Sequence, residues 1–580
     1  MTAYTPTRDL VRDYVSRGLV LLHPDELGID RAIHAKIYDK EKSLFRAKQY
    51  ISAENLPEIL EVLKAPGLVS ACDTLLGPGW AIFPFTHNTP FVSGAYDQHW
   101  HKDDNGPFNG RRPRYHQPLQ IEMLYYPQAV AQDMGPTATL PFSQYWTFDH
   151  EENHDNFAGA DHLDFSYQIE GWERVAVSGE RSDYDPKDIL DRNTAHDLRM
   201  QAAVDALNWP LVEPYEAAPI EAGTVLLYSH NLFHRGNHRR DDWRTWRERP
   251  RFMWRFWLYR TNDFAVDDAV DFAHLAPEPH VAAVWHSVAR WMQGEASTET
   301  APIATAKADL WLTGESQEPA RIGAAYALAA EGKLEFLAQA LRSDRESVRR
   351  AATYGLVSAG SAASEIFSQA TGSVSKWHRK AGVFGLGAVA TPGANALQRL
   401  HDRLINDTSV YVRSVAADGL AGLARRATDS QILSRIVDAL LESLDQEENR
   451  LSMDKAQRRS IKFVRPTDEC DVCEGIGITL GHDRYKPVRS VVRENALASL
   501  VVCAAQGFDL ERDTAERCAH ALFEIAGTDS NLFAAGLAMD ALIRLPGIDH
   551  ARLTQLLEAQ PTLCWYSLQR AGLSYPLLCE

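Results

Sequence analysis

The sequence has few cysteines, little positive charge and no long apolar run. Seven cysteines in 580 residues are sparse and odd in number, which predicts reduced thiols and a cytoplasmic protein rather than a disulfide framework. The formal net charge is −18, and this argues against nucleic-acid or anionic-membrane partners because phosphate contacts need basic patches. No stretch reaches the ~18 apolar residues of a membrane span, and residues 1–17 lack the apolar core of a targeting signal.

Two halves of the chain differ in composition. Residues 1–290 hold most of the tryptophan, histidine and proline, whereas residues 300–580 are rich in Ala, Leu and Arg at helical spacing. A chain of this length fits two to four domains. We therefore predict one domain over 1–290 and a second, all-helical domain over 300–580.

The first half predicts an α+β domain. Helical spacing covers 7–17, 56–63 and 67–76, and a short β-like run covers 19–22. Strand-like runs separated by Gly, Pro, Asn and Asp clusters then follow at 80–85, 119–126, 224–228 and 252–259. This pattern favours a jelly-roll barrel with flanking helices. The charged, aromatic stretch 149–215 is interpreted as an insertion that could fold over a site.

The second half repeats a helical pattern. A basic or polar pair, small residues and a leucine recur at 321–328, 348–356, 377–386, 412–420 and 492–500. Periods of about 30 residues are typical of stacked helix pairs, and small residues allow the helices to approach closely. The pattern resembles HEAT-type repeats and lapses over 445–488, where we expect an inserted loop.

A metal-binding pattern is carried by His101, Asp103 and His234. The first two are separated by one residue, so on a strand their side chains face the same side. His234 ends a β-rich run just before a glycine. Two histidines and one carboxylate leave coordination positions open, which is the ligand set of non-haem Fe(II) oxygenases.

Four segments in order resemble the phytanoyl-CoA dioxygenase-like family of Fe(II)/2-oxoglutarate-dependent oxygenases, over roughly residues 5–265. They are the opening helix with Gly18–Leu22, His101–Asp103, the Met134–Pro141 segment, and His234–Gly236 followed by Arg249–Arg255. Phe142-Ser143 departs from the family's Gly-Ser.

The resemblance implies a double-stranded β-helix, iron held by His101, Asp103 and His234, and 2-oxoglutarate with O2 as cosubstrates. It also implies an arginine that binds the distal carboxylate of 2-oxoglutarate. We assign Arg251, with Arg249 and Arg244 as alternatives. Because Asp103 is present, hydroxylation or another oxidation is favoured over halogenation. No further catalytic side chain is assigned.

Several alternatives remain open at this point. His99 competes with His101 but lacks an Asp two residues later, and His230, His234 and His238 could share one face of a helix, although nearby glycines favour strand and turn. Gln120, Tyr125 or Tyr126 could contact the cosubstrate or pack in the core. Trp254, Trp257 and Tyr259 are interpreted as barrel core.

Two further patterns invite a binding role. The arginine-rich run 239–255 could bind a phosphorylated or coenzyme A substrate, or be a solvated hairpin. Cys470, Cys473 and His482 form an incomplete zinc set, so two thiols in a loop are the simpler interpretation.

The sequence thus predicts an oxygenase acting on a small to mid-sized metabolite. The helical half could bind a carrier protein or another partner, form a dimer or buttress the barrel. The alternatives are a non-catalytic repeat scaffold and an enzyme that hydroxylates a protein side chain.

Overall fold

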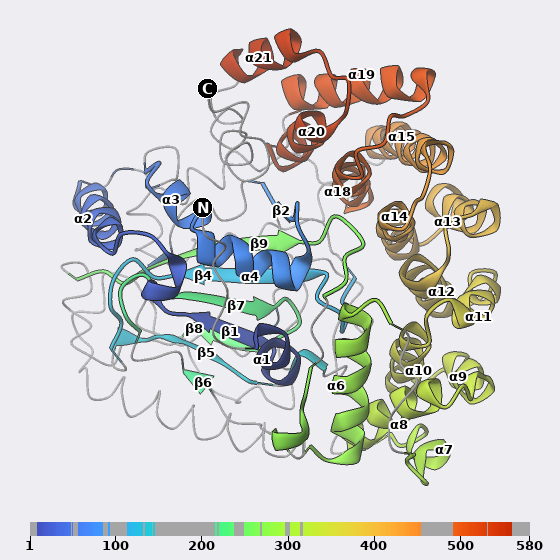
Figure 1. The fold of residues 1–580 in the computed structure, drawn as a ribbon. Coiled ribbons are helices and arrows are strands. Elements are labelled where there is room, and N and C mark those ends of the chain that lie inside the picture. The colour runs from blue at the N-terminus through green and yellow to red at the C-terminus, as the bar shows by residue number, and fades with distance from the viewer. Residues whose placement is uncertain are drawn as a thin grey trace.

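The chain folds into two antiparallel sheets with helices outside them, followed by a curved array of helices (Figure 1). The computed structural model describes residues 9–47, 49, 51, 56–84, 91–92, 102, 113–131, 134–141, 143–145, 215–216, 220–236, 249–266, 270–275, 277–295, 302–313, 317–453, 491–529 and 532–559. The predicted ligands His101 and Asp103, the 149–215 insertion (apart from 215) and the Cys470–His482 group lie outside these residues.

The larger sheet has the strand order β1-β7-β4-β9-β2, with β3 also paired to β9. The smaller sheet has the order β6-β5-β8. The strand bounds are β1 Leu19–Leu22, β2 Ala81–Ile82, β3 Phe91–Val92, β4 Gln120–Tyr125, β5 Thr137–Thr139, β6 Tyr215–Glu216, β7 Val225–Ser229, β8 His234–Gly236 and β9 Phe252–Tyr259. The strands predicted at 19–22, 119–126, 224–228 and 252–259 are therefore confirmed, while the one at 80–85 is reduced to two residues.

Helices cover the outer face of the larger sheet. They are α1 (Leu10–Arg17), α2 (Ala32–Arg46), α3 (Ile59–Leu63) and α4 (Pro66–Leu76). The predictions for 7–17, 56–63 and 67–76 are confirmed within a few residues at each end. Gly18 ends α1 with a φ of 76°, a conformation that glycine adopts without strain.

Helix α2 is absent from the sequence-based prediction. Its buried positions are His34, Ile37, Glu41 and Phe45, so two of the four are polar and the apolar periodicity is hidden. His34 Nδ1 lies 2.9 Å from the Tyr125 hydroxyl, and the Trp254 indole donates to Glu41. Each of these polar side chains thus makes one hydrogen bond to the outer face of the sheet.

The helical half forms two rows. The inner row consists of α6 (Pro279–Met292), α8 (Glu318–Ala330), α10 (Glu346–Ser358), α12 (Lys376–Val389), α14 (Val410–Arg425), α18 (Val491–Ala505) and α20 (Leu532–Arg544). The outer row consists of α7 (Ala306–Asp309), α9 (Leu334–Leu341), α11 (Ser364–Ala370), α13 (Ala394–Asn406), α15 (Ser430–Met453), α19 (Arg512–Thr528) and α21 (His550–Ala559).

Small residues bring neighbouring inner helices close together, as the sequence predicts. A Cβ added at Gly387 of α12 would collide with the backbone of Gly419 in α14. Helix α15 continues to Met453, so the expectation of a loop from residue 445 is wrong for its first nine residues, and 454–490 lie outside the described residues.

The inner row curves around the sheets (Figure 1). Side chains from successive inner helices reach the first half of the chain: Tyr326 of α8, Tyr354 of α10, Asp418 of α14 and Arg544 of α20. Gln506, one residue after α18, also donates to the Thr261 carbonyl. The concave side of the array is therefore filled, along these helices, by the protein's own sheet domain.

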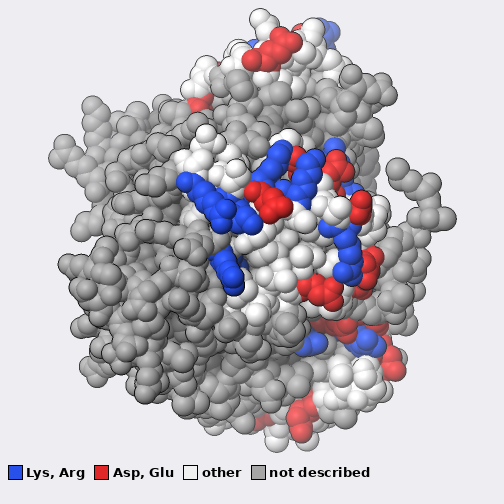
Figure 2. Space-filling model, turned by 90° about the vertical axis from the view of Figure 1, so that its left-hand side faces the viewer, with Lys and Arg blue, Asp and Glu red and all other residues white. Residues whose placement is uncertain are grey.

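The surface over α2 carries charges of both signs (Figure 2). Lys36 and Lys40 pair with Glu58 at 3.3 and 2.5 Å, and Arg31 pairs with Asp25 at 2.6 Å. Basic residues on this face are thus matched by acidic neighbours. Among the described helices, none is long and apolar enough to span a membrane.

Candidate functional site

The candidate site lies between the two sheets. Strand alternation directs Glu122, Leu124 and Tyr126 from β4, and Leu226 and Tyr228 from β7, toward the smaller sheet. The Tyr126 hydroxyl donates a hydrogen bond of 2.7 Å to Thr137 Oγ1 of β5 and so joins the two sheets. Both apolar and polar side chains therefore line this interior.

His234 begins β8 and points into the interior. It is paired in register with Thr139 and is 4% exposed, and its ring lies 5.0 Å from that of Tyr228. His234 Nδ1 lies 3.1 Å from the Leu232 carbonyl oxygen. Because a carbonyl only accepts, Nδ1 carries the proton and Nε2 carries the lone pair.

The loop before His234 is fixed by Ser143. The Phe233 amide donates to Ser143 Oγ at 2.8 Å, and that hydroxyl donates to the Leu140 carbonyl at 2.7 Å. Ser143 thus holds the backbone next to the predicted ligand His234.

Lys102 lies beside the same loop. Its side chain is 1% exposed, and Nζ is 4.7 Å from the centroid of the Phe233 ring. Lys102 is the residue between His101 and Asp103, and Phe233 is adjacent to His234. The side chains of these two sequence neighbours of the predicted ligands are therefore in contact, while His101 and Asp103 themselves lie outside the described residues.

Arg251 occupies the other end of the interior, directly before β9. It is 4% exposed. Burial raises the pKa of Tyr126, and the charge of Arg251, together with the hydrogen bonds that Tyr126 shares with Thr137 and Arg251, opposes that rise. Of the two alternatives, Arg249 is exposed and Arg244 lies outside the described residues. Of the three arginines considered, Arg251 is therefore the one that the structure shows to be buried, and it lies beside the Tyr126 hydroxyl.

One buried polar cluster was missed by sequence reasoning. Glu122 accepts a 2.7 Å hydrogen bond from the Tyr228 hydroxyl, and its other oxygen lies 2.8 Å from His230 Nδ1. Glu122 is fully buried. The available signal was a single acidic residue at an inward position of a largely apolar strand, and its partners are Tyr228 of β7 and His230, which directly follows β7.

The backbone at 230–231 is held by the segment that precedes β4. Arg114 Nη1 donates to the His230 carbonyl at 2.9 Å, and Asn231 Nδ2 donates to the Tyr115 carbonyl at 2.5 Å. His230 therefore lies in the turn after β7 and His234 begins strand β8, as the strand-and-turn interpretation predicts, and the two do not share a helix face. His238 and His99 lie outside the described residues.

The aromatic and strand residues left open by the sequence now divide between two faces. Tyr125 and Trp254 face the helices outside, and Tyr259 stacks on Phe83 at 4.4 Å. Trp257 instead approaches the ring of His230, at 6.0 Å between centroids. Core packing is confirmed for the first three, and Trp257 borders the interior.

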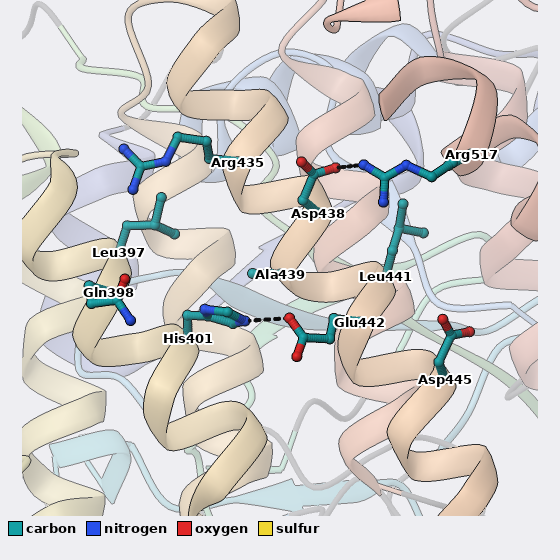
Figure 3. Close-up of a pocket in the computed structure, with 10 residues that line it drawn as sticks. All are labelled: Leu397, Gln398, His401, Arg435, Asp438, Ala439, Leu441, Glu442, Asp445 and Arg517. Carbon is teal, nitrogen blue, oxygen red and sulfur yellow. Dashed lines mark hydrogen bonds and ion pairs between the residues drawn. The ribbon is translucent and has the colours of Figure 1, made fainter. Parts of the chain in front are cut away.

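A pocket of about 470 Å³ lies far from this interior, between α13, α15 and α19 (Figure 3). Its walls carry a contact of 2.8 Å between His401 and Glu442 and an ion pair of 2.7 Å between Arg517 and Asp438. Across the described residues, no three His, Cys, Asp or Glu side chains gather closely enough to share a metal ion.

Comparison with known proteins gives similarity at the level of structure alone. No family model and no curated protein matches the sequence. The epimerase SnoN, solved with Fe3+, alpha ketoglutarate and nogalamycin RO, covers 45% of this chain and 91% of its own at 12% identity, with a TM-score of 0.27. HygX from Streptomyces hygroscopicus, solved with nickel and 2-oxoglutarate, covers 44% and 88% at 10% identity, with a TM-score of 0.27.

The carbocyclase SnoK, a non-heme alpha ketoglutarate dependent enzyme, covers 48% of this chain and 92% of its own at 15% identity, with a TM-score of 0.25. These three structures are thus described as an epimerase and a carbocyclase that use alpha ketoglutarate, and a protein with nickel and 2-oxoglutarate bound.

Proposed function

We propose that the chain is an Fe(II)/2-oxoglutarate-dependent oxygenase whose iron is held by His101, Asp103 and His234. The observation that carries this proposal is the contact between Lys102 and Phe233. Lys102 is flanked in sequence by His101 and Asp103, and Phe233 directly precedes His234, so a side-chain contact between Lys102 and Phe233 supports a common site for the three ligands. Side chains of consecutive strand residues alternate, which would put the three ligands on the face opposite Lys102 and Phe233.

The geometry of His234 fits a metal ligand. Metal-binding histidines usually donate their second ring nitrogen to a carbonyl or carboxylate, which fixes the tautomer and the ring orientation. The 3.1 Å approach of Nδ1 to the Leu232 carbonyl has this form and leaves Nε2 as the coordinating atom. The ring of Tyr228 and the Ser143-bound loop restrict its movement further.

Arg251 is proposed to bind the distal carboxylate of 2-oxoglutarate. A guanidinium forms two parallel hydrogen bonds to a carboxylate, and burial strengthens such a pair. Tyr126 lies beside Arg251 and donates its hydroxyl hydrogen to Thr137 Oγ1, which leaves the Thr137 hydroxyl as a group that can donate to the same anion. The bound iron, 2-oxoglutarate and O2 would together supply the oxidation of a substrate C–H bond.

The remaining residues keep the interior rigid and dry. The Tyr228–Glu122–His230 hydrogen bonds lock three inward polar side chains on adjacent strands, and Leu124, Leu226 and Met253 surround them. A fixed, water-poor interior orients reactants at low entropic cost. The substrate is proposed to be a small to mid-sized metabolite. The helical half is proposed to be HEAT-like, and the protein to act in the cytoplasm.

Anaerobic titration of the apoprotein with Fe(II) and 2-oxoglutarate tests the proposal. We expect a weak visible metal-to-ligand charge-transfer band that is lost in His101→Ala, Asp103→Ala and His234→Ala and weakened in Arg251→Ala. His401→Ala and Arg249→Ala are matched controls, because His401 lies in the outer helical row and Arg249 is exposed. A folded, iron-loaded wild type without the band would rule the oxygenase out.

A further inference from the structure

The inner row of helices packs against and hydrogen-bonds a short segment of the sheet domain, residues 114–116, which lies a few residues before β4. From this arrangement we infer that the helical array is a positioning element of the candidate metal site. It fixes 114–116, and this segment fixes the 230–234 loop that carries His234. The inference rests on the proposed function for the identity of the site, and it concerns Tyr115, His116 and Asp418 as positioning residues.

The first contact is made by Tyr115. Its hydroxyl donates a hydrogen bond of 2.8 Å to Asp418 Oδ2 of α14, and its ring stacks on Phe384 of α12 at 4.5 Å. Asp418 is 2% exposed. A charge-assisted hydrogen bond at a buried carboxylate is strong and directional, so it fixes the position of Tyr115 relative to two inner helices.

The second contact is made by His116. Its ring stacks on Tyr354 of α10 at 3.7 Å between centroids, and Nδ1 lies 2.7 Å from the Tyr326 hydroxyl of α8. Burial, and then the charge of Lys102, lower the pKa of His116 well below its usual value. His116 is therefore neutral and links the inner row to the surroundings of Lys102.

The third link runs from residues 114–116 to the predicted ligand. Arg114 donates to the His230 carbonyl, and the Tyr115 carbonyl accepts from Asn231. The Arg114 carbonyl in turn accepts a 2.8 Å hydrogen bond from Tyr354 of α10. Three consecutive residues thus connect α8, α10, α12 and α14 on one side with the turn that leads to His234 on the other.

These connected contacts predict that removing the hydrogen bond between Tyr115 and Asp418 weakens metal binding. In Tyr115→Phe and Asp418→Leu we expect the Fe(II) dissociation constant, measured anaerobically with saturating 2-oxoglutarate, to rise about tenfold. This is the lower end of the roughly 10- to 100-fold range for removing residues that orient metal ligands. Asp418→Asn keeps an oxygen acceptor and should restore binding to within about twofold of the wild type.

The matched control is Ser414→Ala. Ser414 lies one turn before Asp418 on α14 and accepts a buried 2.7 Å hydrogen bond from Asn495 of α18, within the helical array. We expect this variant to lower the melting temperature about as much as Tyr115→Phe while Fe(II) affinity stays unchanged. A loss of affinity that merely followed stability would appear in both variants and would contradict the inference.

A second measurement uses the unmodified protein. Linkage is reciprocal, so Fe(II) with 2-oxoglutarate should slow amide hydrogen exchange in α10 and α14 but not in α13 and α19 of the outer row. The positioning role would be overturned if Fe(II) with 2-oxoglutarate changed the exchange rate equally in all four helices and the Fe(II) affinity were unchanged in Tyr115→Phe and Asp418→Leu. A wild type that shows no charge-transfer band would instead remove the proposed function and, with it, this inference.

Discussion

The hydroxyl of Tyr115 and the carboxylate of Asp418 lie 2.8 Å apart although 303 residues separate them in the chain. The contact crosses from the sheet domain to the inner helical row, and similar contacts recur from α8 to α20. The two halves therefore share one buried interface, and the surface on which repeat arrays usually bind partners is occupied within the same chain.

Truncation after residue 300 should prevent stable folding of the sheet domain. It would expose Tyr115, His116 and Phe83, which are now at most 9% exposed or engaged with the helices, and a large exposed apolar patch promotes aggregation. Expression of residues 1–300 should give aggregated protein in size-exclusion chromatography. A monomeric fragment with the full protein's cooperative thermal transition would contradict this prediction.

Substitution of Arg251 should affect 2-oxoglutarate more than iron. Arg251→Lys keeps the charge but loses the two-point geometry, so the dissociation constant for 2-oxoglutarate should rise about ten- to a hundredfold, as expected for a hydrogen bond to a charged group. Arg249→Lys, at an exposed position, should leave it unchanged. Isothermal titration of each iron-loaded variant measures the dissociation constant for 2-oxoglutarate. Equal effects of the two substitutions would contradict the assignment of Arg251 as the residue that binds the distal carboxylate.

Loss of Glu122 should be costly for stability. Glu122→Ala leaves His230 and Tyr228 buried without their shared partner, and removing one member of a buried pair costs about 3–5 kcal/mol of unfolding free energy. The control is Glu442→Ala, which breaks a partly exposed Glu–His pair of the same 2.8 Å length and should cost under about 1 kcal/mol. Urea denaturation of both variants gives the comparison, and similar losses would show that the interior pair is not critical.

Acid should lower the free energy of unfolding through His116, one of the residues that contact the inner helices. The pKa of His116 is lowered in the folded state, first by burial and then by Lys102, while the unfolded value is about 6.5. Its contribution to stability is therefore complete above that pH and is lost as the pH falls below it, because the unfolded chain then binds the proton more tightly.

The free energy of unfolding measured from pH 8 to pH 5 tests this dependence. His116→Phe keeps the ring stacked on Tyr354 and removes the titrating group, so its curve should fall less steeply below about pH 6.5 than that of the wild type. Parallel curves would show that another group is responsible for the acid sensitivity.

Runs of strand-forming residues, most of them bounded by Gly, Pro, Asn and Asp clusters, placed β1, β4, β7 and β9 in the sequence, because buried strands leave short apolar segments between turn residues. Helical periodicity was the corresponding signal for helices. It failed for α2, whose buried face includes His34 and Glu41; their partners Tyr125 and Trp254 become neighbours only after folding. Glu122 was missed for the same reason. Its place opposite Tyr228 depends on the pairing of β4 with β7, which no local pattern contains.

The sequence by itself determined four of the strands and the succession of helices in the second half, and it carries the residues proposed to hold iron and a dicarboxylate. Those properties are local and follow from spacing and side-chain chemistry. Only the tertiary structure decided that Lys102 meets Phe233, that Arg251 rather than Arg249 is buried, and that the inner helices hold Tyr115 and His116. Such contacts join residues more than a hundred positions apart, and it is the packing of the whole chain that brings them together.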